Sequence, residues 1–154
     1  MSIQRPIFFQ DTSAERVVRI HNELLARGPR LLVQLLSRYG NESVTNDALV
    51  DTGADITSFE ETIIRRLGYT PHGSVTIQTA AGKEHRGIYL VRVAIPQRQR
   101  EHRILQVEVA GLGKIHKNSE LPFALIGRDI LHRGSLSYNG PLGEFQLDLL
   151  PEAS

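Results

Sequence analysis

The chain carries the stretch Ala48-Leu49-Val50-Asp51-Thr52-Gly53-Ala54-Asp55-Ile56-Thr57, and this stretch decides its fold. A short apolar segment leads into an acid, a hydroxyl residue and a glycine, and a second acid follows four positions after the first. This order predicts a carboxylate presented on a tight turn at the end of a strand. The Asp-Thr-Gly unit occurs once in the chain, so a carboxylate of this kind that needs an equivalent partner must find it elsewhere.

The composition is that of one soluble globular domain. The chain has 154 residues, of which 40% are hydrophobic and 23% are charged, and this length can bury a sizeable core. A net charge of +1 gives no electrostatic footprint for nucleic acid or an acidic membrane surface. Cysteine is absent, which excludes disulfides, a thiolate nucleophile and cysteine metal sites. We expect no signal peptide, no membrane span and a cytoplasmic location.

The N-terminal part of the chain predicts a helix over Thr12–Gly28. Thr12 and Glu15 form a capping-box pattern, and a Gly-Pro pair ends the segment. Apolar residues recur inside it at helical spacing, namely Val17, Ile20, Leu24 and Leu25. We therefore expect a helical extension over residues 1–28, which serves packing or an interface, ahead of one β domain over residues 29–154.

The rest of the chain predicts short strands separated by turn signals. The expected strands are Arg30–Ser37, Asp47–Val50, Ser74–Thr79, Gly87–Ile95, Arg103–Ala110, Phe123–Ile126, Ser135–Tyr138 and Glu144–Leu149. Two short helices are expected, one over Glu60–Leu67 with Thr57 or Ser58 as its cap, and one over Arg128–His132. Asn139-Gly140-Pro141 predicts the hairpin turn between the last two strands.

Several kinds of chemistry are open to an aspartate on a strand-terminal turn, which can be a nucleophile, a metal ligand, a general base or a structural cap. The six histidines show no paired spacing for a metal site, so no metal or cofactor is expected. No Gly-x-Ser-x-Gly elbow occurs, which leaves serine catalysis unsupported. Acid–base work by carboxylates remains, with an ordinary Asx-type turn as the structural alternative.

Two motifs together resemble the retropepsin-type aspartic proteases. The first is Asp51-Thr52-Gly53-Ala54-Asp55, and the second, further along, is Ala124-Leu125-Ile126-Gly127-Arg128-Asp129-Ile130-Leu131. The resemblance covers roughly Arg30 to Leu149. It implies an all-β fold, a mainly antiparallel closed β-barrel with two or three short helices. A stand-alone cellular or bacterial relative fits this chain better than a viral enzyme, because a helix stands upstream of the matching part.

The resemblance implies an aspartic endopeptidase that acts on peptides or proteins as a homodimer. In that family two carboxylates share one proton, because two like charges so close cannot both ionise. The charged member activates a water and the protonated member donates to the substrate carbonyl. Asp51 of each subunit would supply one carboxylate, and Thr52 and Gly53 would complete the catalytic turn. The alternative is a retropepsin-like dimerisation or peptide-binding module that hydrolyses little or nothing.

The resemblance also assigns the residues around the catalytic turn. Substrate contacts are expected from one acid, the tip of a hairpin that would act as a flap, and two pocket walls: Asp55, Thr79, Ala80, Ala81, Gly82, Phe123 and Leu125. Structural support is expected from Ala54, Gly127, Arg128 and Asp129. Arg128 would pair with Asp55 or a nearby carboxylate, and a purely structural ion pair remains open for it.

Overall fold

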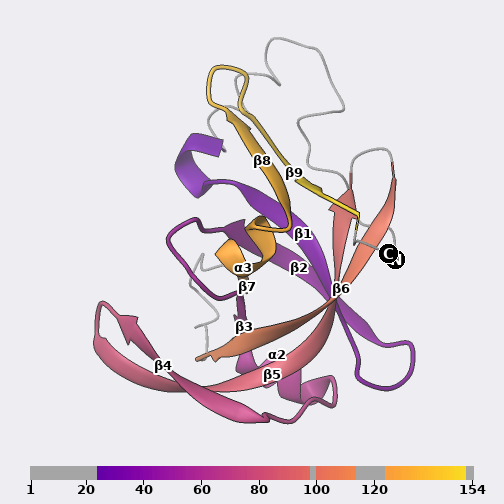
Figure 1. The fold of residues 1–154 in the computed structure, drawn as a ribbon, viewed down its shortest axis with the longest axis vertical. Helices are drawn as coiled ribbons and strands as arrows, with labels where there is room; N and C mark the ends of the chain where they lie inside the picture. Colours follow the sequence, from indigo (N-terminus) through magenta and orange to yellow (C-terminus); the bar gives the residue numbers. More distant parts are fainter. Residues whose placement is uncertain (1–23, 98–99, 114–123, 152–154) are drawn as a thin grey trace.

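A computed structural model describes residues 24–97, 100–113 and 124–151 of the chain, which form a barrel with a separate hairpin (Figure 1). The strands are β1 Arg30–Leu36, β2 Ser43–Val50, β3 Ser58–Glu60, β4 Gly73–Thr79, β5 Gly82–Gln97, β6 Arg100–Leu112, β7 Ala124–Ile126, β8 Gly134–Asn139 and β9 Glu144–Leu149. Two short helices interrupt them, α2 Glu61–Arg66 and α3 Arg128–Leu131. No helix in the described ranges is long and apolar enough to cross a membrane.

Six strands close into the barrel. Their order is β1-β2-β7-β3-β6-β5, and β1 pairs with β5 to complete the circle, while β4 extends the sheet beyond β5. Most neighbours are antiparallel, and the parallel pairs are β2 with β7 and β3 with β6. The prediction of an all-β, mainly antiparallel closed barrel with short helices is therefore confirmed.

The core follows from the alternation of side chains along the strands. In β1 every second residue is buried, beginning with Leu31 and including Val33 and Leu35, as expected for a strand with one face inside a barrel. The long strands β5 and β6 repeat this pattern, and each helix adds one fully buried isoleucine, Ile64 in α2 and Ile130 in α3. The two helices are thus fixed to the barrel by apolar contact, because neither is long enough to be stable alone.

The hairpin of β8 and β9 forms a second, two-stranded sheet. Tyr138 lies opposite Phe145 and Leu136 opposite Leu147, so apolar side chains share one face, and Phe145 and Leu147 are buried. The amide of Leu149 donates to Gln97 Oε1 at 2.9 Å, which ties the hairpin to the end of β5. The turn predicted at Asn139-Gly140-Pro141 is confirmed.

Several sequence-based bounds are wrong in a consistent direction. Strand β2 begins at Ser43 and not at Asp47, and β5 and β6 both extend beyond their expected ranges. Asn and Asp disfavour strands in general, but pairing with β1 holds this part of β2 in the sheet. The sequence does not predict strand β3. Its three residues form a strand because they pair with β6 on one side and with β7 on the other.

The predicted helix caps have mixed outcomes. The N-cap of α2 is Glu60, and it makes no side-chain capping hydrogen bond, so the expected cap at Thr57 or Ser58 is wrong. Most of the helix predicted over Thr12–Gly28 lies outside the described residues, and only residues 24–27 are seen as a helical turn. Gly28 ends that turn in the left-handed region, with φ +74° and its amide donating to the Leu24 carbonyl at 3.0 Å.

Candidate active site

Asp51 stands on a tight turn directly after β2. Its amide donates to the Ile126 carbonyl at 2.9 Å, and its own carbonyl accepts the Ala54 amide at 3.2 Å. The Gly53 amide donates to Asp51 Oδ1 at 2.9 Å. Asp51 is half-buried, whereas Thr52 and Gly53 are exposed. One carboxylate oxygen is therefore held by the turn, and within the described residues the other has no hydrogen-bond partner.

Strand β7 supports this turn from the side. It lies between β2 and β3, so Val50 pairs with Ile126 just before the turn begins. The next residue, Gly127, packs against the loop so closely that a Cβ there would lie 2.8 Å from the Ile56 carbonyl carbon and 3.0 Å from the Ala54 carbonyl oxygen. The structure thus brings together Asp51, Ala54 and Gly127, three residues predicted from two motifs far apart in the chain.

A buried polar cluster joins the end of the loop to helix α3. The Thr57 hydroxyl donates to Asp129 Oδ1 at 2.7 Å, and the Thr57 amide donates to both carboxylate oxygens at 3.0 and 3.1 Å. The same hydroxyl accepts the Gly127 amide at 3.0 Å, and the Ile130 amide also donates to Asp129 Oδ1, at 2.9 Å. Thr57 is fully buried. Asp129 therefore joins the end of the loop to α3 through Thr57, a residue that the sequence does not mark as part of the site.

Arg128 does not make the ion pair that the sequence suggested. Its Nη1 donates to the Thr52 carbonyl at 2.8 Å, and among the described residues no carboxylate lies within ion-pair distance of it. Asp55 is exposed at the edge of the turn. The expected pairing is wrong because the guanidinium extends along the backbone of the Asp51 turn, to the Thr52 carbonyl. Arg128 still supports the turn, through a carbonyl in place of a carboxylate.

The predicted hairpin between Ser74 and Ile95 is present as β4 and β5, and it extends away from the barrel (Figure 1). Its tip is a two-residue connection between Thr79 and Gly82, which pair across it, so Ala80 and Ala81 are exposed. The Thr79 hydroxyl donates to the Gly82 carbonyl at 2.9 Å and accepts the Ala81 amide at 3.2 Å. Gly82 has φ +122°, a conformation that favours glycine.

The remaining candidate pocket residues are placed only in part. Leu125 is half-buried on β7, where it pairs with Leu49 beside the Asp51 turn. Phe123 lies outside the described residues. Within the described part of the chain, no cluster of three or more His, Asp or Glu side chains could hold a metal ion.

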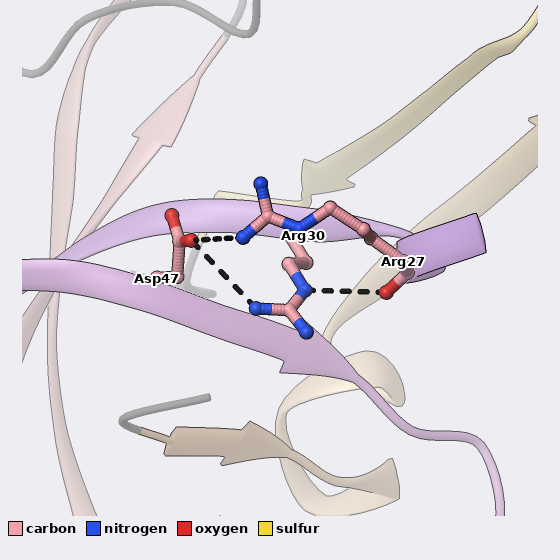
Figure 2. A network of polar contacts seen from close by, with 3 residues as sticks. All are labelled: Arg27, Arg30 and Asp47. Atoms are coloured by element: carbon pink, nitrogen blue, oxygen red, sulfur yellow. Dashed lines mark hydrogen bonds and ion pairs between the residues drawn. The ribbon is translucent and has the colours of Figure 1, made fainter. Parts of the chain in front are cut away.

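An ion cluster fixes the chain just ahead of β1, as Figure 2 shows. Asp47 Oδ2 lies 3.4 Å from Arg27 Nη2 and 3.8 Å from Arg30 Nη1, and Arg30 Nε donates to the Arg27 carbonyl at 3.2 Å. The segment between the arginines reaches the end of β2, because the Pro29 carbonyl accepts the Val50 amide at 2.8 Å. The cluster therefore holds the residues that lie against the end of β2.

The chain resembles solved protease structures in its fold. A retropepsin-like aspartic protease from Rickettsia conorii superposes with a TM-score of 0.51 at 18% identity, over 80% of this chain and 88% of that one. The retroviral protease-like domain of Ddi1 from Leishmania major gives 0.47 at 16% identity, over 80% and 95%. The EIAV protease, solved with the inhibitor HBY-793, gives 0.44 at 23% identity, over 70% and 88%. No family model and no curated protein matches the sequence.

The likeness to the Rickettsia protein agrees with the topology described above. The resemblance that two short motifs suggested is therefore confirmed for the fold. At this level of identity the likeness concerns the fold, and the chemistry must be argued from the residues of this chain. The chain has the fold of the retropepsin-like aspartic proteases.

Proposed function

We propose that this protein is an aspartic endopeptidase whose active site combines Asp51 from two copies of the chain. The observation that carries the proposal is the catalytic turn itself. A half-buried carboxylate stands at the end of a barrel strand, with one oxygen fixed by the Gly53 amide at 2.9 Å and the other oxygen available. This is the presentation that a general base needs.

The need for a second copy follows from what surrounds Asp51. Asp129, an acid on the supporting helix, is occupied by Thr57 and by the Ile130 amide, and Asp55 has its own exposed position on the turn. No second carboxylate of the described chain is thus offered to Asp51 as a partner. A symmetry-related Asp51 would supply it on a twofold axis, and the exposed Thr52 and Gly53 would lie at the contact.

In the proposed reaction the two Asp51 carboxylates hold one proton between them, because two like charges at hydrogen-bond distance cannot both ionise. The charged carboxylate takes a proton from a water, which attacks the peptide carbonyl, and the protonated carboxylate donates to the carbonyl oxygen. The tip of the β4–β5 hairpin, Thr79 to Gly82, would cover the substrate. Asp55 and Leu125 would contact it from the barrel side.

The test is digestion of a peptide library with and without pepstatin, by the wild type and by Asp51→Asn. The amide is nearly isosteric but cannot act as the general base, so we expect loss of cleavage with the fold retained. Glu101→Gln, an exposed residue on β6, makes the same change of charge and serves as the matched control. Cleavage by Asp51→Asn at the wild-type rate would refute the mechanism.

Mixing the two chains tests whether the site is shared. If each active site needs Asp51 from both copies, activity should fall with the square of the wild-type fraction after exchange of subunits. A linear decrease would mean that one chain is sufficient. A wild type that dimerises and binds peptides without cleaving them would instead identify a peptide-binding module.

A further inference from the structure

Strand β5 belongs to two parts of the molecule, and the change occurs at one residue. Ile88 pairs with Gly73 of β4 and also with Ala110 of β6. Before Ile88, β5 is one arm of the protruding hairpin, and after it β5 is a strand of the barrel (Figure 1). The contacts around Ile88 therefore determine how the hairpin leaves the barrel.

Glu61, the first residue of α2, occupies a narrow slot at this junction. Two glycines form the slot, Gly87 on β5 and Gly111 on β6, which lie on the same side of the Ile88–Ala110 pair. A Cβ on Gly111 would lie 3.0 Å from Glu61 Cβ and Cδ, and a Cβ on Gly87 would lie 3.2 Å from Glu61 Oε1. Neither strand could carry a larger side chain here without displacing the glutamate. The absence of side chains at two neighbouring strand positions thus lets a helix residue reach the hairpin base.

The slot ends at a buried tyrosine on β5. The Tyr89 hydroxyl donates to Glu61 Oε1 at 2.5 Å, and Arg65 Nη2 lies 3.4 Å from the same oxygen. The Tyr89 side chain is fully buried. Burial raises the pKa of the Tyr89 phenol, and the hydrogen bond to Glu61 raises it further, so the hydroxyl stays a donor. A hydrogen bond to an ionised carboxylate is stronger than a neutral one.

We infer that Glu61 is a positioning residue, which sets the orientation of the β4–β5 hairpin. Its side chain lies against Gly87 and Gly111 and accepts the Tyr89 hydroxyl. Helix α2 thereby fixes the base of the β4–β5 hairpin, and the tip lies at the other end of these two strands. Without the Glu61–Tyr89 contact the tip of the hairpin would occupy more positions, and it would bind a peptide less tightly. This consequence for catalysis rests on the function proposed above, whereas the effect on the hairpin does not.

Hydrogen exchange tests the inference without any need for activity. The reporter is the His72 amide, which donates to the Ile88 carbonyl at 2.9 Å at the hairpin base. The barrel reference is the Val50 amide, which donates to the Pro29 carbonyl at 2.8 Å. In Tyr89→Phe we expect the His72 amide to exchange roughly tenfold faster, because a charge-assisted hydrogen bond is lost. Glu61→Gln should have a smaller effect in the same direction, because the amide oxygen still accepts.

The matched control is Glu60→Gln, which changes the neighbouring acid that accepts the Thr62 hydroxyl at 2.9 Å. It should leave both reporter amides at the wild-type rate. Equal acceleration at His72 and Val50 in Tyr89→Phe would mean a loss of global stability alone and would overturn the inference, as would unchanged exchange at His72. In cleavage assays we expect Tyr89→Phe to have a higher KM than the wild type, with kcat little changed. If the wild type cleaves no peptide, the proposed function fails, and the exchange data still decide the inference about the hairpin.

Discussion

Replacement of Thr57 by valine tests the buried hydrogen bonds that support the Asp51 turn. Valine keeps the shape of threonine but has no hydroxyl. The change therefore removes two hydrogen bonds, the one that Thr57 Oγ1 donates to Asp129 at 2.7 Å and the one that it accepts from the Gly127 amide at 3.0 Å. The backbone contacts of Thr57 to Asp129 remain.

The expected loss of stability is large for a change of one atom. A hydrogen bond to a charged group contributes roughly 1.5–3 kcal/mol, and a buried donor left without a partner costs about 1–3 kcal/mol. Asp129 keeps the amides of Thr57 and Ile130 as donors, which places the sum toward the lower end. We expect Thr57→Val to lower the free energy of unfolding by about 3 kcal/mol. Thr57→Ser keeps the hydroxyl and should lose only about 1 kcal/mol, from one buried methyl group.

Urea unfolding of the three proteins measures these differences. The midpoint urea concentration should fall in the order wild type, Thr57→Ser, Thr57→Val. The slope of the free energy of unfolding against urea concentration should stay unchanged. A serine variant that loses as much stability as the valine variant would show that the methyl group contributes as much as the hydroxyl, which would contradict the predicted order. A valine variant within about 0.5 kcal/mol of the wild type, the range of ordinary surface changes, would refute the reasoning.

Three further predictions concern other parts of the molecule. Gly127→Ala should cost several kcal/mol, roughly 2–4, in urea unfolding, because its Cβ would lie 2.8 Å from backbone carbon; a loss below about 1 kcal/mol would mean that the loop moves aside easily. Asp47→Asn should lower stability by only about 0.5–1 kcal/mol, because its two arginine contacts are partly exposed, and the loss should shrink at high salt. Because the pKa of Tyr89 is raised above its ordinary 10.0 in the folded state, stability should be intact below pH 10 and fall at higher pH as the folded phenol ionises. Alkaline unfolding of Tyr89→Phe should lack this component, and an identical pH profile would contradict the assignment.

The sequence predicts the parts of the site that depend on local patterns. A turn at Asp51 follows from an apolar strand and a glycine, and the start of α3 at Arg128 follows from the second motif. The hairpin tip between Thr79 and Gly82 is similarly local. In each case a few neighbouring residues carry the information, so no knowledge of distant contacts is needed.

The parts that the sequence does not predict depend on distant contacts. Thr57 reads locally as a helix cap, but its hydroxyl is used by Asp129, which lies 72 positions away in the chain. Arg128 reads as half of an ion pair, yet it binds the Thr52 carbonyl from 76 positions away. A three-residue strand such as β3 has too few residues for a periodic pattern and exists only because two partners flank it. Pairings of this kind are fixed by the closure of the barrel, which composition and periodicity do not describe.

In the proposed function the site has a supporting part that one chain completes and a reactive part that needs a second chain. Gly127, Thr57 and Asp129 satisfy one another within the chain, whereas Asp51 keeps an oxygen without a partner in the described residues and Thr52 is exposed. Folding and the proposed catalysis should therefore respond to different substitutions. Thr57→Val should lower stability and Asp51→Asn should not, because the amide oxygen of asparagine can still accept the Gly53 amide that Asp51 Oδ1 accepts. Asp51 of a second copy would interact with the carboxylate oxygen that has no partner in the described residues of the first, and this is the physical reason for proposing an active site between two chains.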